Sequence, residues 1–232
     1  MRTIFLVLIY AVLIIVLAVL LLICWPLGLR DPLLGVAKWA MSLAPPILGI
    51  KVEVSGREEV DKGTPYIFMA NHLSFLDGPL LFLLIPRPIR VILKKEIFRI
   101  PVIGQGMRFV GFVPVDRKGV RGGKKSINLA SRLMREKNYS YLIFPEGTRS
   151  RDGRIQAFKR GGFFLALESG APIVPITIGG TYGLMPRGTI FPQRGRVKVR
   201  FYPPVPIQGY DQSTLGGLAG KVKAVIESGL TA

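Results

Sequence analysis

The sequence predicts an α/β fold, a largely parallel central sheet flanked by helices, preceded by an N-terminal membrane-anchoring helical segment. Three observations support this fold class. Short apolar runs recur between residues 66 and 202 and are typical of buried strands. Segments with a helical apolar period lie between them, and residues 3–25 form a long uncharged run. Strands that alternate with helices favour a sheet whose strands run mostly parallel.

The first 49 residues are expected to form the anchor, and residues 50–232 the α/β domain. At 1.5 Å per residue, an uncharged helix over residues 3–25 would be about 35 Å long, enough to cross a hydrocarbon core of about 30 Å. A cleaved signal peptide is the alternative, but its apolar region usually has about 7–15 residues and a small-residue cleavage site. Residues 33–43 contain Lys38 and Trp39, which suits an interfacial or re-entrant helix and equally a plain core helix.

Each further element is predicted from the period of its apolar residues. Residues 50–54 alternate apolar and charged side chains, as in a half-covered strand. More deeply buried strands are expected at residues 66–70, 90–93, 111–115, 139–144, 173–178 and 197–202. Helices are expected at residues 78–84, 126–137, 161–169 and 215–228.

The chain is strongly basic. It has 32 Lys and Arg against 14 Asp and Glu, a formal net charge of +18. Such a surface attracts polyanions: nucleic acid, anionic lipid headgroups, or phosphorylated small molecules such as coenzyme A. With one cysteine, Cys24, and one histidine, the sequence excludes an intrachain disulfide and a Cys₂His₂ zinc site, and we expect no metal centre.

The single histidine, His72, follows the strand expected at residues 66–70. It lies in the stretch Asn71-His72-Leu73-Ser74-Phe75-Leu76-Asp77. A carboxylate entering the next helix can reach such an imidazole, fix its tautomer and stabilise the imidazolium, as a general base requires. A lone histidine is also often a structural residue, but an adjacent asparagine and an aspartate five positions later favour a site.

A second stretch, Phe144-Pro145-Glu146-Gly147-Thr148-Arg149-Ser150, follows another expected strand. Open α/β sheets bind ligands beyond the carboxyl ends of their strands. Gly147 allows close backbone approach, Thr148 offers a hydroxyl, and Arg149 offers a planar fork of donors that matches phosphate. Glu146 would hold Arg149 or contact a substrate hydroxyl. The alternative is an exposed turn with an ordinary ion pair.

Both stretches resemble signature blocks of the glycerolipid acyltransferases, in particular the 1-acylglycerol-3-phosphate acyltransferases: Asn-His-x-x-x-x-Asp and FPEGTRS. Weaker blocks resemble the same family at residues 94–101 (with Ile97 in place of leucine), 111–117 and 174–176, so the resemblance covers about residues 50–180. It implies His72 as base and Asp77 as its orienting partner. It also implies substrate-binding roles, which fall on Glu146, Gly147, Thr148, Arg149, Arg117 and Lys94.

The resemblance implies transfer of an acyl chain from acyl-CoA or acyl carrier protein to the free hydroxyl of 1-acylglycerol 3-phosphate, giving phosphatidic acid. No Gly-x-Ser-x-Gly block occurs and the one cysteine lies in the anchor, so we expect no covalent intermediate and no cofactor beyond the acyl donor. The expected partners are the lysophospholipid, the donor and membrane lipids. The catalytic domain is expected on the cytoplasmic face of the membrane.

Three alternatives remain at this point. The same chemistry could act on another lysolipid or on glycerol 3-phosphate. A membrane-tethered nucleic-acid-binding module is disfavoured because aromatic residues are not interleaved with the basic ones, so no nucleic-acid partner is expected. A hydrolase in which His72 activates water is disfavoured by the missing nucleophile block.

Overall fold

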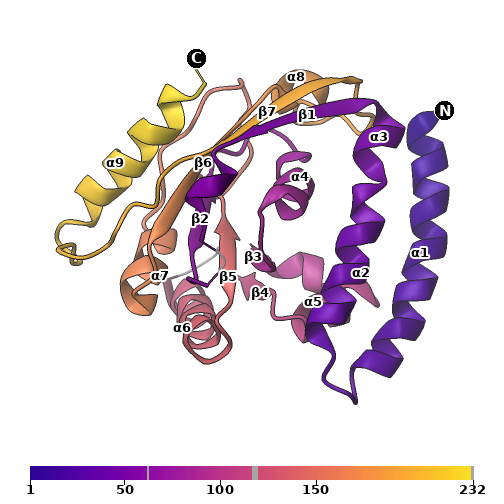
Figure 1. Ribbon diagram of the computed structural model, residues 1–232, viewed down its shortest axis with the longest axis horizontal. Coiled ribbons are helices and arrows are strands. Elements are labelled where there is room, and N and C mark those ends of the chain that lie inside the picture. Colours follow the sequence, from indigo (N-terminus) through magenta and orange to yellow (C-terminus); the bar gives the residue numbers. More distant parts are fainter. Residues whose placement is uncertain (62, 117–119, 231–232) are drawn as a thin grey trace.

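The computed structural model describes residues 1–61, 63–116 and 120–230, which fold around a seven-stranded mixed sheet (Figure 1). Its strand order is β1-β7-β6-β2-β5-β3-β4. All neighbouring strands pair in parallel except β6 and β7, which are antiparallel. The predicted α/β class with a largely parallel sheet is therefore confirmed. The strands are β1 (Ile50–Ser55), β2 (Ile67–Ala70), β3 (Ile89–Lys94), β4 (Val113–Val115), β5 (Ser140–Ile143), β6 (Ile173–Gly179) and β7 (Gly195–Phe201).

The middle of the sheet explains why the strand patterns differ along the sequence. β2 lies between β5 and β6, with Phe68 opposite Leu142 and Val174, and all four of its residues are buried. Its side chains alternate between two apolar cores, one on each face of the sheet. At one end of the sheet, β7 buries only alternate residues, and the edge strand β1 buries Ile50 and half-buries Val52 and Val54, because one face of this pair meets solvent.

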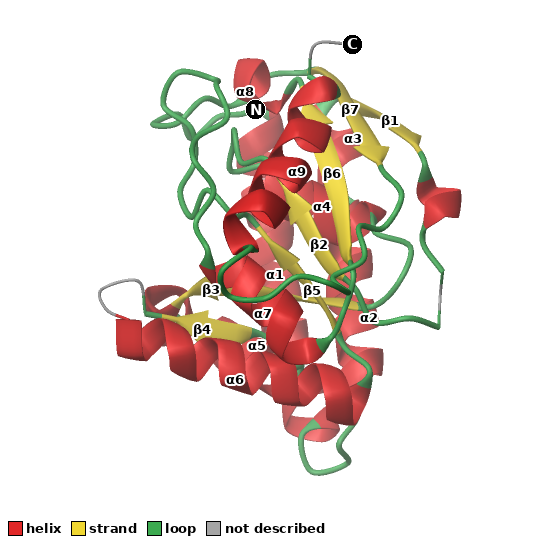
Figure 2. Ribbon diagram, turned by 90° about the vertical axis from the view of Figure 1, so that its left-hand side faces the viewer, coloured by secondary structure: helices red, strands yellow, loops and turns green. Residues whose placement is uncertain are grey.

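Helices cover both faces of the sheet. Figure 2 shows α6 (Val120–Lys137), α7 (Gly161–Ser169) and α9 (Leu215–Ser228) on one face. The opposite face carries α4 (Asp77–Leu84) and α5 (Ile103–Phe109), with α8 (Thr181–Leu184) near the start of β7. Two 3₁₀ turns, η1 (Arg57–Glu59) and η2 (Lys95–Arg99), follow β1 and β3. The helix expected at residues 126–137 begins earlier, at Val120, and the strand expected from residue 111 begins at Val113.

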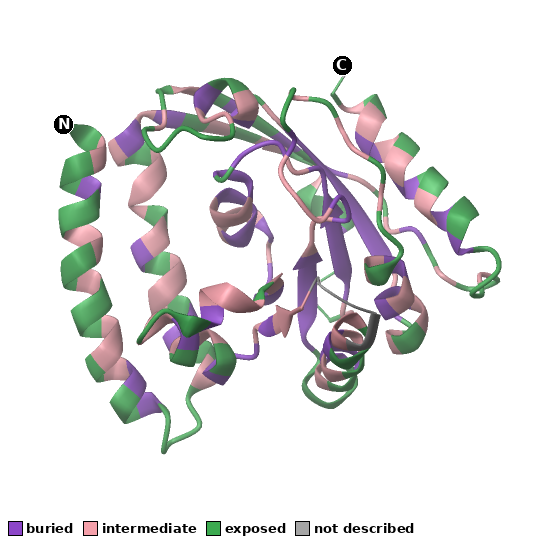
Figure 3. Cartoon of the chain, turned by 180° about the vertical axis from the view of Figure 1, so that it is seen from behind, coloured by how far each residue is buried: buried purple, intermediate pink, exposed green. Residues whose placement is uncertain are grey.

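The N-terminal segment forms an antiparallel helix pair, α1 (Arg2–Cys24) and α2 (Arg30–Ser42), followed by the short α3 (Ala44–Leu48). By length and composition α1 qualifies as a membrane span. Its inner side joins the core on the α4 face of the sheet, while most of its apolar side chains are exposed (Figure 3). The predicted boundary between residues 49 and 50 falls between α3 and β1, and the division into two domains stays a prediction.

Both ends of α1 contact the α/β domain. At the C-terminal end, Trp25 stacks on Phe109 of α5, with ring centroids 5.2 Å apart. At the N-terminal end, the Arg2 guanidinium lies at Gly49, where the Cβ of Arg194, directly before β7, also lies. The following helix is also fixed, because Asp31 of α2 pairs with the buried Arg90 of β3. The helix pair therefore lies along the domain instead of projecting from it.

Candidate functional site

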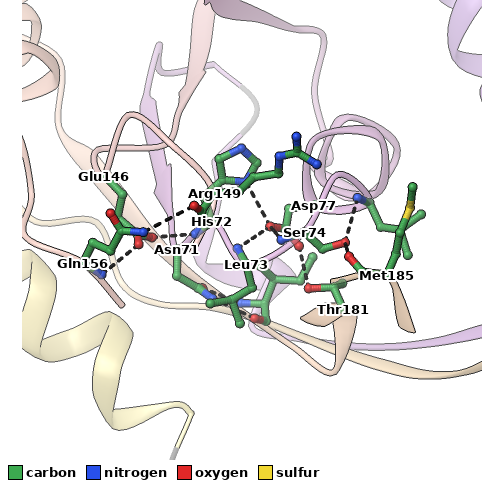
Figure 4. Close-up of polar contacts among 12 residues, drawn as sticks. Asn71, His72, Leu73, Ser74, Asp77, Glu146, Arg149, Gln156, Thr181 and Met185 are labelled. Atoms are coloured by element: carbon green, nitrogen blue, oxygen red, sulfur yellow. Dashed lines mark hydrogen bonds and ion pairs between the residues drawn. The ribbon is translucent and has the colours of Figure 1, made fainter. Parts of the chain in front are cut away.

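The loop that joins β2 to α4 brings the one histidine and its aspartate together. His72 Nδ1 lies 3.0 Å from Asp77 Oδ2, which confirms that the two side chains are within hydrogen-bonding distance (Figure 4). The Asp77 side chain is fully buried, whereas the His72 side chain is 20% exposed. Asp77 is the first residue of α4, where a negative charge is favoured by the backbone N–H groups and by the helix dipole.

The surroundings of Asp77 determine which nitrogen of His72 carries the hydrogen. Asp77 Oδ2 also accepts hydrogen bonds from the backbone N–H groups of Leu73 and Ser74, each at 2.7 Å. Asp77 Oδ1 accepts the Thr181 hydroxyl at 2.6 Å. Because an ionised carboxylate only accepts, Nδ1 of His72 is the donor, and Nε2 keeps a free lone pair. The imidazole is thereby arranged to take up a proton at Nε2.

The His72 loop is fixed to the sheet by polar side chains. The Asn71 amide donates to the carbonyl of Ile178 at 2.8 Å and accepts from its N–H at 2.9 Å, so it pairs with the end of β6 like a further strand residue. The buried Ser74 hydroxyl donates to the Met185 carbonyl at 2.8 Å. These contacts hold the loop from two sides, which leaves the His72 ring little freedom to move.

The segment after β5 holds the backbone of His72. Glu146, 1% exposed, accepts the His72 N–H at 2.6 Å through Oε1 and the Gln156 N–H at 2.8 Å through Oε2. The Ser150 N–H donates to the His72 carbonyl at 2.8 Å. Burial raises the pKa of the Glu146 carboxyl above its ordinary value, while the two N–H donors act in the opposite direction. Both Glu146 oxygens thus face backbone groups, and the Phe144 ring of the same segment stacks on the His72 ring.

The other predicted binding residues lie around this core. Arg149 is half-buried and lines the cavity beside His72, with its guanidinium 5.9 Å from the Phe75 ring centroid. Lys94 lines the same cavity and is 3.6 Å from Glu96. Thr148 is half-buried, and Arg117 lies outside the described residues.

Gly147 has a φ of +72°, a backbone conformation that favours glycine, and a side chain there would meet Lys159 Nζ at 3.0 Å. Lys159 also lines the cavity. Sequence reasoning missed Lys159, and it missed Thr181, which is 104 residues from its partner Asp77. No spacing in the sequence indicates either residue, since only the fold brings them to the site.

A cavity of about 1100 Å³ extends from His72 between the sheet and the helices α1, α2 and α5. Small-molecule sites usually measure about 300–1,000 Å³, so this cavity has room for a long ligand. Its wall is mainly apolar and includes Leu17, Leu33, Phe82 and Met107. Two cationic residues, Arg149 and Lys159, also line the cavity. They lie near His72, because the Phe144 ring stacks on the His72 ring and the Lys159 N–H donates to the carbonyl of the adjacent Pro145. Such a cavity suits a molecule with an anionic head and a long apolar chain.

The chain is similar in sequence and in fold to named acyltransferases. It is 36% identical over 159 residues to a 1-acyl-sn-glycerol-3-phosphate acyltransferase of Limnanthes douglasii, a match that covers 68% of the chain and 56% of the relative. A 1-acyl-sn-glycerol-3-phosphate acyltransferase of Borreliella burgdorferi is 33% identical over 158 residues, a match that covers 68% of this chain and 62% of the relative. The crystal structure of the 1-acyl-sn-glycerophosphate acyltransferase PlsC of Thermotoga maritima superposes with a TM-score of 0.81 and 27% identity, covering 99% of this chain and 94% of that one.

The chain thus spans a little over half the length of the plant relative that it matches. A family model described as Acyltransferase matches residues 51–179, which include the His72 loop, the segment after β5 and all of β6. Because this match covers more than half of the chain and contains both signature blocks, the chain belongs to the acyltransferase family.

Proposed function

We propose that the protein transfers an acyl chain from an acyl thioester to the free hydroxyl of 1-acylglycerol 3-phosphate, giving phosphatidic acid. One observation carries the proposal. The His72 imidazole bonds to the buried Asp77 through Nδ1, which leaves Nε2 free to accept a proton, and His72 lines a long apolar cavity that cationic side chains also line. The relatives are named as acyltransferases of this acceptor, which supports the proposed substrate.

The reaction needs one base and no covalent intermediate. As the hydroxyl oxygen of the acceptor attacks the thioester carbonyl carbon, His72 Nε2 takes the hydroxyl proton, and the carbonyl electron pair moves to oxygen. When the tetrahedral intermediate collapses, the carbon–sulfur bond breaks and the imidazolium returns the proton to the departing thiolate. Asp77 stabilises the imidazolium in between. Direct attack is favoured because the Ser74 hydroxyl is buried and bonded to Met185, and Cys24 lies at the end of α1.

The cationic side chains bind the acceptor phosphate. Arg149 offers its guanidinium fork, and Lys159 adds a point charge beside Gly147. Lys94 lines the same cavity, and Arg117, outside the described residues, keeps the phosphate-binding role that the family resemblance implies. Glu146 has both oxygens on backbone N–H groups, and we therefore assign it as a positioning residue for His72 rather than as a substrate ligand.

The anchor would deliver the lipid substrates to this cavity. The exposed apolar face of α1 enters the bilayer, while its inner face and α2 form a wall of the cavity. Because both ends of α1 contact the same domain, we infer that the helix lies along one membrane surface. We assign this surface to the cytoplasmic side, as expected from the sequence. An acyl chain then passes from the bilayer into the cavity without crossing water. The donor is acyl-CoA or acyl carrier protein, either of which suits the basic surface.

The test is an assay of the detergent-solubilised full chain with lysophosphatidate and labelled acyl-CoA. Wild type and a Lys221→Ala control, which changes an exposed residue of α9, should both form labelled phosphatidate. His72→Ala should form at least about a hundredfold less, the usual size of a general-base effect. Free fatty acid as the only product would contradict acyl transfer to the lipid and favour the hydrolase.

Two further measurements address the finer parts of the proposal. Glycerol 3-phosphate and lysophosphatidylcholine, supplied in place of lysophosphatidate, should be poorer acceptors, and a preference for either would refute the assigned acceptor. Rapid quenching followed by intact-protein mass spectrometry should find no acyl group on the chain. A trapped acyl-enzyme would refute direct attack while leaving the overall reaction intact.

A further inference from the structure

The loop of residues 185–194, which joins α8 to β7, exposes two large apolar side chains at adjacent positions. Ile190 is 71% exposed and Phe191 is 59% exposed. Single exposed apolar residues are ordinary on soluble surfaces. The N-terminal segment up to α2 exposes many large apolar residues. In the rest of the described chain, Ile190 and Phe191 are the only two such residues that are adjacent in sequence.

The charged residues within the loop are all positive. Arg187 and Arg194 flank the apolar pair and are exposed. Basic residues continue along β7, where the exposed positions are Arg196, Lys198 and Arg200, and Arg196 pairs with Glu53 of β1 at 3.2 Å. No Asp or Glu occurs between residues 185 and 201. Apolar side chains flanked by cations suit a surface that is apolar inside and anionic outside, as an anionic bilayer is.

The loop adjoins the N-terminal end of α1. A Cβ atom placed on Gly49 would lie 2.7 Å from a guanidinium nitrogen of Arg2 and 3.3 Å from Cβ of Arg194, so both residues meet at that glycine. Figure 1 shows the same neighbourhood, with α3 and the start of β1 close to the N-terminus. The loop therefore meets the N-terminal end of α1 at Gly49, and the exposed apolar face of that helix is the one that we assign to the membrane.

The base of the loop is bonded to the His72 loop. Thr181, at the start of α8, donates to Asp77, and the carbonyl of Met185 accepts the Ser74 hydroxyl. The Gln193 N–H closes the loop on the Leu184 carbonyl at 2.8 Å. A force that fixes the loop at a given depth would thus also fix the height of the His72 loop above the bilayer.

We propose that residues 186–194 form a second membrane contact, separate from α1. Ile190 and Phe191 insert among the acyl chains of an anionic leaflet, and Arg187 and Arg194 bind lipid phosphate groups at its surface. The contact sets the distance between the bilayer and the His72 loop. The proposed insertion does not depend on the enzyme's reaction, so this inference rests on the proposed function only for the effect of the contact on turnover.

The first experiment measures insertion directly. Cys24 is the only cysteine, so Cys24→Ala combined with Phe191→Cys gives the full chain a single labelling site for an environment-sensitive fluorophore. The matched control combines Cys24→Ala with Leu230→Cys, which labels an exposed apolar position beyond α9, the helix packed on the opposite face of the sheet. Both proteins are transferred from detergent to vesicles of phosphatidylcholine, alone or mixed with phosphatidylglycerol.

We expect the fluorescence of the label at position 191 to shift to the blue and to be quenched by spin-labelled acyl chains. Both effects should be strongest in vesicles that contain phosphatidylglycerol. The label at position 230 should stay in water. A label at position 191 that stays in water while the protein sediments with the vesicles would overturn the proposal. A response to RNA or to an acidic protein without lipid, and none to vesicles, would also overturn it.

The second experiment tests the effect on turnover. Ile190→Ser with Phe191→Ser should lower phosphatidate synthesis about tenfold when lysophosphatidate is embedded in anionic vesicles, and leave synthesis in detergent micelles unchanged. Leu230→Ser should leave both unchanged. An equal loss in both media would indicate a folding defect and contradict the proposal. If wild type shows no turnover in either medium, the proposed function fails, and the fluorescence result still decides the membrane contact.

Discussion

Replacing Asp77 by asparagine tests how the carboxylate acts on His72. Asp77 Oδ2 receives three N–H donors, from Leu73, Ser74 and the His72 ring, whereas the one donor to Oδ1 among the described residues is the Thr181 hydroxyl. The new amide should therefore place its oxygen at the Oδ2 position and direct its NH₂ at Thr181, whose hydroxyl can turn to accept. The reverse orientation would set NH₂ against three donors. Asp77→Asn should thus keep the hydrogen on Nδ1 and remove only the charge.

The geometry bounds the size of the effect. At the observed 3.0 Å, a carboxylate stabilises an imidazolium by about 5.5 kcal/mol for an effective dielectric constant near 20, which is an upper limit for a ring that is partly exposed. The neutral hydrogen bond to the amide oxygen retains part of this. We expect a loss of about 3 kcal/mol, or roughly a hundredfold in kcat/KM. In a Ser-His-Asp triad the corresponding change costs about ten thousandfold, because there the imidazole adopts the wrong tautomer.

The assay combines kinetics with NMR. Because the chain has a single histidine, ¹⁵N-histidine labelling gives the signals of one imidazole, and the shifts of Nδ1 and Nε2 report the tautomer directly. Wild type and Asp77→Asn should both carry the hydrogen on Nδ1. A variant with the hydrogen on Nε2, or a loss near ten thousandfold, would refute the reasoning. Asp77→Ala is the contrast, since it leaves buried donors without an acceptor and should lower the free energy of unfolding by about 1–3 kcal/mol for each.

Further predictions concern the phosphate, the cavity and pH. Arg149→Ala should raise the KM for lysophosphatidate about tenfold or more, with a smaller change in kcat. Arg149→Lys keeps the positive charge and should raise the KM less. An unchanged KM in both variants would show that Arg149 does not bind the phosphate. Gly106→Phe should fill cavity space between α5 and α1, because a Cβ atom placed on Gly106 would lie 4.0 Å from the Leu21 side chain. It should lower kcat/KM for long acyl-CoA about fourfold per excluded methylene, and uniform losses across chain lengths would contradict this. Hydrogen bonds from the Ser213 hydroxyl, Thr214 and the Ser213 N–H lower the pKa of Asp211 from 3.8 to about 2. The ionised Asp211 therefore stabilises the folded state above about pH 4, and this stabilisation is lost as the pH falls toward 2. Asp211→Asn should make the midpoint of thermal unfolding less dependent on pH over that interval.

The sequence predicted the elements well wherever burial is uniform. β2, β5 and β6 are buried on both faces, so their residues appear as unbroken apolar runs, and their existence was evident without coordinates. Boundaries were less accurate near turns. The strand expected from residue 111 begins two residues later, because Gly111, with a φ of +94°, lies in the turn after α5. Local apolar period carries no information on such backbone turns.

For the site, the sequence indicated residues but not their orientation. The pairing of His72 with Asp77 was predicted because five residues at a strand-to-helix junction keep the two close whatever the rest of the chain does. Glu146 was expected to face a substrate or Arg149, yet its oxygens bond to the backbone of His72 and Gln156. Which way a carboxylate turns depends on backbone donors 10 to 74 residues away, and sequence spacing does not encode their positions.

The sequence by itself determined the fold class, the apolar N-terminal helix, the basic surface and the two signature blocks, because each depends on composition or on neighbours along the chain. The tertiary structure decided how α1 and α2 lie, which cavity they close, and that Thr181 and Lys159 belong to the site. The physical reason is that β2 lies between β5 and β6 in a parallel sheet, which brings the ends of distant strands to one edge. Contacts across that edge arise only once the chain has folded.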